Sequence, residues 1–147
     1  MRHACAMTLT DPVEQLRSVG LRVTRPRQAV IGVVRDHPHA TAPEVFAAVR
    51  EALPSVSQQA VYDCLGALSE AGLLRRIDIG GGVSRYESRV GDNHHHLVCT
   101  SCGTIVDIDC ATGEAPCLSP DHDHGFDIAH ADVVYRGLCP ACRAARE

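Results

Sequence analysis

The chain has 147 residues, which is enough for one ordinary domain or two small ones. Its formal net charge of −4 argues against a protein that binds polyanions over its whole surface. No apolar run is long enough for a signal peptide or a membrane span, so the sequence predicts a cytoplasmic protein with no membrane role. In a reducing compartment, its eight cysteines are better interpreted as metal ligands than as disulfide partners.

The two halves of the chain differ in charge. Residues 1–90 carry 11 Arg against 9 acidic side chains, whereas residues 91–147 carry 3 Arg against 9 acidic side chains. The chain has no Lys, and the planar Arg side chain matches phosphate with two parallel N–H groups. This pattern predicts two small domains, 1–90 and 91–147, with a local nucleic-acid surface permitted in the first.

Four short helices are predicted in the first domain from their start and stop signals. Each start has a side chain that can cap the first turn, and Pro or Glu often follows at a favourable position. The stops are Gly residues or Pro-containing pairs. The starts are Asp11, Thr24, Thr41 and Ser57, and the ends are Gly20, His37-Pro38, Pro54 and Gly72.

The fourth predicted helix is amphipathic, and a hairpin follows it. Three- and four-residue steps place one set of side chains on the buried face: Val61, Cys64, Leu65 and Leu68. The outward set is Gln58, Gln59, Tyr62, Gly66 and Ser69. Two β-like runs then flank Gly80-Gly81-Gly82, so helices followed by a hairpin predict a winged helix-turn-helix domain.

The second domain has short β-like runs and few aliphatic residues. The runs are Leu97-Val98, Thr104–Ile108 and Val133–Tyr135. This pattern predicts a small α/β domain, and therefore an α+β fold class for the whole chain. Its core is too small to be strong alone, so we expect it to depend on metal, on a partner subunit, or on both.

Two CxxC pairs indicate a structural zinc site. Cys99 and Cys102 form one pair, Cys139 and Cys142 form the other, and 36 residues separate them. Structural Zn²⁺ takes four tetrahedral ligands, and each pair can supply two thiolates from one tight turn. Redox-active pairs or disulfides are the alternative interpretation.

A second metal site is indicated by His94-His95-His96. On an extended strand, His94 and His96 point to the same side. Glu87 precedes them and Asp107 follows, and imidazole plus carboxylate ligands suit Fe²⁺, Mn²⁺ or Zn²⁺. The alternative is a solvated surface run of histidines.

These motifs together resemble the ferric uptake regulator (Fur) family of dimeric metal-dependent repressors, in order from about Val13 to Cys142. The segments that carry the resemblance are 21–27 (LRVTRPR), 39–46 (HATAPEVF), 57–62 (SQQAVY), 71–73 (AGL), 85–87 (RYE), 94–99 (HHHLVC) and 137–142 (GLCPAC). The resemblance implies a regulatory metal site for Fe²⁺ or Mn²⁺, which Zn²⁺ can also occupy in purified protein. Its ligands would be His39, Glu87, His94, His96 and Asp107.

The resemblance also implies a DNA interface. The fourth helix would enter the major groove of an A/T-rich inverted-repeat operator, with Tyr62 touching base edges or thymine methyl groups. Gln side chains can pair with adenine. Arg22 would reach the minor groove and Arg27 would meet phosphate. The implied DNA-binding residues are Arg22, Arg27, Ser57, Gln58, Gln59 and Tyr62, whereas Arg75 and Arg76 can equally be a solvated face.

Several positions depart from the family pattern. Asp63 stands where many members have Arg, which removes a phosphate contact. Asn93 and Ala131 occupy two positions of a further metal site, and His130 is one residue out of register, so that site is not expected in its usual form. Cys110 and Cys117 can be a redox pair or buried structural thiols, and His122 and His124 can be ligands or an exposed polar loop.

The sequence therefore predicts a homodimeric repressor and not an enzyme. The segment from Asp109 to Leu118 is similar to the branch of the family linked to catalase-peroxidase genes, which favours peroxide sensing through Fe²⁺. Asp107 agrees with this function, whereas Glu87 agrees with the alternative, an iron-responsive repressor of iron-uptake genes. A zinc metalloenzyme and a zinc-ribbon adaptor are the remaining alternatives, although the sequence offers no nucleophile or oxyanion loop.

Overall fold

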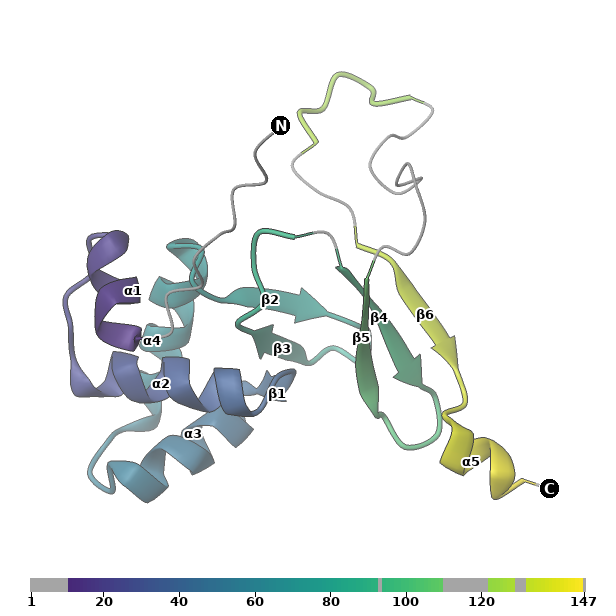
Figure 1. Cartoon of the computed structure of the whole chain (residues 1–147), viewed down its shortest axis with the longest axis horizontal. Coiled ribbons are helices and arrows are strands. Elements are labelled where there is room, and N and C mark those ends of the chain that lie inside the picture. The colour runs from purple at the N-terminus through teal and green to yellow at the C-terminus, as the bar shows by residue number, and fades with distance from the viewer. Residues whose placement is uncertain (1–10, 93, 110–121, 129–131, 147) are drawn as a thin grey trace. The chain divides into compact units, whose positions relative to one another are not determined.

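The first compact unit of the chain contains four helices. In the computed structural model, which describes residues 11–92, 94–109, 122–128 and 132–146, the chain divides into the units Met1–Val90 and Gly91–Glu147. The helices of the first unit are α1 (Pro12–Ser18), α2 (Arg25–Asp36), α3 (Ala42–Ala52) and α4 (Gln58–Glu70) (Figure 1).

The predicted helix starts are confirmed by their capping hydrogen bonds. The Asp11 side chain accepts from the backbone N–H of Val13, and the Thr24 and Ser57 hydroxyls accept from backbone N–H groups three residues later. Thr41 and Glu44 cap α3 reciprocally, with the Thr41 backbone N–H donating to Glu44 Oε2 at 2.7 Å. These side chains satisfy N–H groups that have no partner inside the helix.

The core of the first unit lies between the helices. As predicted, α4 buries Val61, Cys64, Leu65 and Leu68. The fully buried side chains that meet them come from the other three helices: Leu16, Val30, Val34, Val45 and Val49. Each such aliphatic side chain contributes about 1.5–3 kcal/mol through removal from water, so this core fixes the position of α4.

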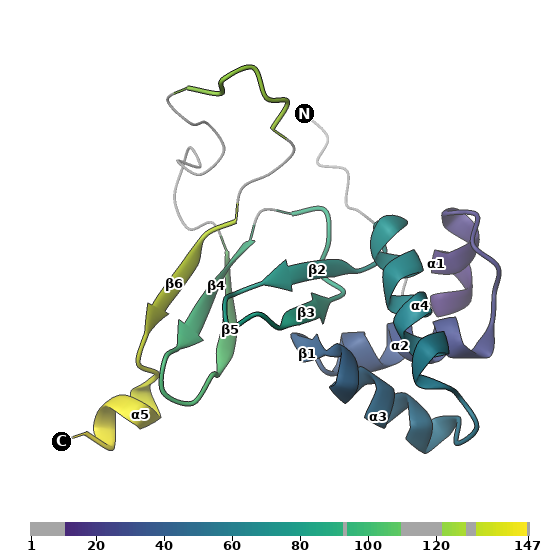
Figure 2. The same cartoon turned by 180° about the vertical axis from the view of Figure 1, so that it is seen from behind.

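A small antiparallel sheet completes the first unit. The hairpin strands are β2 (Arg75–Asp78) and β3 (Ser84–Glu87), and β1 (Ala40–Thr41) adds to the free edge of β3 in the order β1-β3-β2 (Figure 2). The glycine turn between β2 and β3 has φ values of 95°, 82° and 72°, which glycine adopts readily. The hairpin was predicted but β1 was not, because two residues carry no periodicity.

The second unit has a mixed sheet and one short helix. Its strands are β4 (His94–Cys99), β5 (Ile105–Asp109) and β6 (Val134–Gly137), and α5 (Pro140–Ala144) follows. The central strand β4 pairs antiparallel with β5 and parallel with β6. The chain therefore has the predicted α+β class. Within the described ranges, none of the helices has the length and apolar character needed to cross a bilayer.

Candidate metal centres and nucleic-acid interface

The four predicted zinc ligands lie together in the second unit. Cys99 ends β4, Cys102 follows in the next turn, Cys139 caps α5, and Cys142 lies within α5. Their four sulfur atoms lie within 4.8 Å of one another, and Cys102 Sγ is 3.8 Å from Cys139 Sγ. A zinc tetrahedron with Zn–S bonds near 2.3 Å has edges of about 3.8 Å, so this donor set fits Zn²⁺.

Hydrogen bonds lower the thiol pKa at two of these cysteines and raise it at a third. The Cys139 N–H donates to Cys99 Sγ at 3.4 Å. Backbone N–H groups of Cys102 and Cys139 lower the pKa of Cys99 to about 6, and the Thr104 hydroxyl lowers the pKa of Cys102. Ser101 favours the Cys142 thiolate, yet hydrogen bonds to the Cys139 and Cys102 sulfurs outweigh it and raise the pKa of Cys142 to about 12. Zn²⁺ binding therefore has to displace the Cys142 proton.

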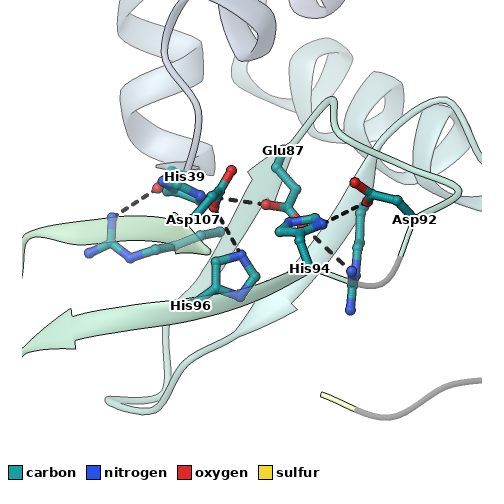
Figure 3. Close-up of polar contacts among 8 residues, drawn as sticks. His39, Glu87, Asp92, His94, His96 and Asp107 are labelled. Atoms are coloured by element: carbon teal, nitrogen blue, oxygen red, sulfur yellow. Dashed lines mark hydrogen bonds and ion pairs between the residues drawn. The ribbon is translucent and has the colours of Figure 1, made fainter. Parts of the chain in front are cut away.

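In the first unit, His39 and Glu87 form a buried pair. His39 lies in the turn before β1, and its N–H donates to the Tyr86 carbonyl at 2.9 Å, which extends the β1–β3 ladder. Its φ of 69° is in the left-handed region, where non-glycine residues are uncommon. His39 Nε2 lies 3.5 Å from Glu87 Oε2, and the side chain of Glu87 is 1% exposed (Figure 3).

Two arginines hold this pair in place. Arg75 Nε lies 3.8 Å from Glu87 Oε1, and the β2–β3 register sets Arg75 opposite Glu87. Arg85 Nη1 donates to the His39 carbonyl at 3.0 Å. Arg75 was expected either to be solvated or to contact DNA, but its side chain is only 17% exposed and it faces Glu87. Its neighbour Arg76 is exposed, and its Nε donates to Ser84 Oγ at 2.7 Å.

In the second unit, His94 and His96 lie on the same side of β4, as alternation predicts. Their ring centroids are 5.0 Å apart. His96 stands opposite Asp107 in the β4–β5 register, and His96 Nε2 lies 3.3 Å from Asp107 Oδ1 (Figure 3). His94 Nδ1 lies 2.8 Å from Asp92 Oδ1. With a proton on Nδ1 directed to Asp92, Nε2 would be the ring atom that could bind a metal.

The exposed face of α4 differs slightly from the predicted one. Gln58 and Gln59 are exposed as expected, whereas Tyr62 is half-buried and packs against the core. Tyr62 lies only about 100° around the helix from the buried Val61, so its ring borders the core. Asp63 lies further around and is exposed, and its Oδ1 accepts a hydrogen bond from Gln59 Nε2 at 2.8 Å.

The remaining predicted DNA-binding residues lie near the starts of α2 and α4. The Ser57 hydroxyl caps α4 by accepting from the Ala60 N–H at 3.1 Å. Arg22 is exposed, and Arg27 is half-buried with Nη1 donating to the Arg22 carbonyl at 2.8 Å. Arg27 therefore braces the turn that carries Arg22, a role that its spacing in the sequence did not indicate.

Other sequence expectations concern the second unit. Asn93, Cys110, Cys117, His130 and Ala131 lie outside the described residues. The exposed rings of His122 and His124 stack with centroids 4.3 Å apart, and His122 Nδ1 accepts from the His124 backbone N–H at 3.0 Å. Those contacts agree with an exposed polar loop.

Sequence reasoning missed Arg75, Arg85, Asp63 and Asp92 as residues that support the candidate sites. Asp63 had a signal, because it follows Gln59 by four residues and such positions are neighbours on a helix. No sequence signal indicated Asp92 or Arg85. Asp92 reaches His94 from a loop, and Arg85 contacts His39 from a segment that is distant in the sequence.

A winged-helix unit, a four-thiolate cluster and His–carboxylate pairs define the class of metal-binding, DNA-binding regulators. The sequence pattern described as the ferric uptake regulator family matches residues 18–136. The chain belongs to this family, and it is a metal-dependent transcriptional regulator.

Named relatives agree with this assignment. The "Transcriptional regulator FurA" of Mycobacterium tuberculosis is 60% identical over 135 residues, which cover 92% of each chain. The Pseudomonas aeruginosa ferric uptake regulator with manganese aligns with a TM-score of 0.64 and 26% identity, over 88% of this chain and 98% of that one. The Campylobacter jejuni peroxide stress regulator gives the same TM-score, identity and coverage. The chain is thus similar to transcriptional regulators of this family.

Proposed function

We propose that the chain is a homodimeric repressor that senses peroxide through Fe²⁺ bound by His39, Glu87, His94, His96 and Asp107. The observation that supports this most directly is the presence of two His–carboxylate pairs, the buried pair His39–Glu87 and the pair of buried His96 with partly exposed Asp107. They offer only nitrogen and oxygen donors, which suit Fe²⁺ and Mn²⁺ better than the soft thiolates of the cysteine cluster do.

The metal would act as a switch because its ligands come from both units. A metal ion stabilises the arrangement in which the His39–Glu87 pair and the β4 histidines can reach it together. Binding therefore shifts the population toward one arrangement of the two units. In the proposed repressor, that arrangement brings the two α4 helices of a dimer to adjacent major-groove segments of an A/T-rich inverted repeat.

Peroxide would reverse the switch by chemistry at the same ligands. Bound Fe²⁺ would supply the electrons that reduce H₂O₂ next to the ligand imidazoles. His39 and His94 would be the candidate targets. Overall, one H₂O₂ would oxidise one ring by two electrons, adding one oxygen to a ring carbon and leaving one water, and the oxidised ring would no longer be a metal ligand. The Asp107 carboxylate and the likeness to the C. jejuni peroxide stress regulator support this proposal.

The test measures anaerobic DNA binding before and after a low dose of H₂O₂. The probe is a duplex selected from a randomised library by the Mn²⁺-loaded protein. We expect H₂O₂ to release DNA from the Fe²⁺ form but not from the Mn²⁺ form, with one added oxygen on a peptide that contains His39 or His94. Metal-dependent binding that peroxide leaves unchanged in both forms would instead support the iron-responsive alternative, which Glu87 favours.

The proposed dimer would form through the second unit. Leu97 pairs with Val106 on β5 and with Tyr135 on β6, so the three side chains form a row across the sheet. They are 43%, 50% and 50% exposed, which is unusual for an apolar row.

If this row forms the dimer interface, Val106→Glu should convert the dimer to monomers, as measured by sedimentation. Val83→Glu, in the β2–β3 turn, is the control and should leave the dimer intact. Dimers that persist in Val106→Glu would place the interface elsewhere.

A further inference from the structure

The composition of α4 is unfavourable for phosphate binding. The helix contains no Lys or Arg, and its exposed residues include Asp63 and Glu70. A carboxylate that faces a DNA groove is repelled by the flanking phosphates and lowers affinity. Asp63 therefore needs a function that offsets this cost if α4 enters a groove.

The hydrogen bond from Gln59 to Asp63 provides such a function. Gln59 Nε2 lies 2.8 Å from Asp63 Oδ1, one helical turn away, and both side chains are exposed. An ionised carboxylate only accepts hydrogen bonds, so it binds the NH₂ end of the Gln59 amide and repels the carbonyl end. Asp63 thus selects one of the two otherwise similar orientations of this amide.

The selected orientation leaves one N–H and the Oε1 acceptor of Gln59 available. This donor–acceptor pair matches the N7 acceptor and the N6 amino group of adenine in the major groove. The carboxylate also polarises the amide, which strengthens the remaining N–H as a donor. The arrangement is thus suited to recognise adenine while it disfavours contacts with phosphate alone.

We propose that Asp63 is a specificity-determining positioning residue that orients Gln59 for one adenine of the operator. This inference rests on the function proposed above, in which α4 enters the major groove. An acidic residue at position 63 removes a phosphate contact and so lowers the affinity for DNA of any sequence. Through its contact with Gln59, Asp63 would also increase the discrimination between bases.

The experiment uses the full-length, Mn²⁺-loaded protein and the duplex selected from a randomised library. Each selected adenine is replaced in turn by 7-deazaadenine, which lacks the N7 acceptor. The wild-type protein should lose about five-fold in affinity at one adenine, the usual effect of one hydrogen bond. Gln59→Ala should lose nothing further at that adenine.

Two substitutions at Asp63 separate orientation from charge. Asp63→Asn keeps an oxygen that can accept from Gln59, so it should retain most of the loss of affinity that 7-deazaadenine causes, which we call the 7-deazaadenine penalty. Asp63→Ala removes the acceptor and should reduce this penalty by about two-fold, the usual contribution of such a side-chain pair. Both variants should bind unselected duplex more tightly than the wild type does, because a negative charge is removed.

Glu70→Gln is the matched control for charge. Glu70 is exposed on the same helix but lies about three turns from Gln59. This variant should also bind unselected duplex more tightly, but it should keep the full 7-deazaadenine penalty. All these side chains are exposed, and equal urea midpoints would confirm that the variants are folded.

Three results would overturn the proposal. An unchanged penalty in Asp63→Ala would show that Asp63 does not position Gln59. A changed preference at a cytosine in Asp63→Ala, but not in Gln59→Ala, would show that Asp63 reads a base by itself. If the wild-type protein selects no sequence with Mn²⁺, the proposed DNA-binding function fails, and this inference fails with it.

Discussion

At the scale of single residues, backbone strain and buried charge accompany the candidate regulatory ligands. His39 has a left-handed backbone, and it is held there by the Tyr86 carbonyl and by Arg85. Strained residues persist only where their surroundings determine them, and they often occur at functional sites. The strain at His39 thus agrees with the role that its position implies.

Substitutions at His39 should separate strain from metal binding. His39→Asn and His39→Ala both remove the imidazole, but Asn tolerates a left-handed backbone better than Ala does. We expect His39→Ala to be about 1 kcal/mol less stable than His39→Asn in urea unfolding. Both variants should lose the stabilisation that Mn²⁺ gives the wild type. Equal stability of the two variants would show that the φ of 69° carries no cost.

Arg75 should compete with metal for Glu87. The Arg75 guanidinium compensates a carboxylate that is 1% exposed. In Arg75→Ala, we expect the metal-free protein to lose about 1–3 kcal/mol of unfolding free energy, because a buried charge loses a partner. Mn²⁺ should then raise the melting temperature more than it does in the wild type. Arg76→Ala, at the exposed neighbouring position, is the control and should change neither quantity.

At the scale of elements, the start of α3 is stabilised by the reciprocal cap of Thr41 and Glu44. The backbone N–H and then the hydroxyl of Thr41 hold the pKa of the Glu44 carboxyl below its usual value of 4.5. The ionised form is the one that is bound, so its contribution to stability is complete above pH 4.5. It is lost as the pH falls through the lowered pKa.

This cap predicts a pH-dependent difference between wild type and Glu44→Gln. The wild type should be more stable at pH 7, by less than about 1 kcal/mol because the site is near the surface. The difference should shrink below pH 4.5. Thr41→Ala should cost about 1 kcal/mol at pH 7. A difference between wild type and Glu44→Gln that grows on acidification would contradict the cap.

At the scale of the whole molecule, we expect the second unit to depend on zinc at its four-cysteine site. It has short strands and a five-residue helix, so its apolar core is small. A zinc ion held by these cysteines would tie the end of β4 to the start of α5. Zinc binding energy is then folding energy for this unit.

Loss of one thiolate should therefore unfold the second unit before it affects sensing. We expect Cys99→Ser to lose zinc in metal analysis and to become monomeric and sensitive to protease. Cys64→Ala is the control, because Cys64 lies in the core of the first unit, where burial raises the pKa of its thiol. That variant should keep its zinc. A stable, metal-responsive Cys99→Ser dimer would show that the site does not support the second unit.

The sequence by itself determined the helix starts, the buried face of α4, the hairpin and the four cysteines that lie together as candidate zinc ligands. Those features follow from local rules: a cap lies within three residues of the groups it satisfies, and a CxxC pair forms within one turn. The resemblance of short sequence motifs also indicated the family. The addition of β1 to β3 was not predictable, since strand pairing of distant segments leaves no local signal.

Only the tertiary structure decided which partners Arg75 and Arg27 have. In the folded chain, Arg75 lies next to Glu87, and Arg27 donates a hydrogen bond to the Arg22 carbonyl. The sequence alone is equally consistent with an Arg side chain that binds phosphate. The tertiary structure also showed that Asp63 accepts a hydrogen bond from Gln59, a contact that their four-residue spacing permits but does not require. Long side chains reach several partners at similar cost, so the backbone around them determines which contact forms.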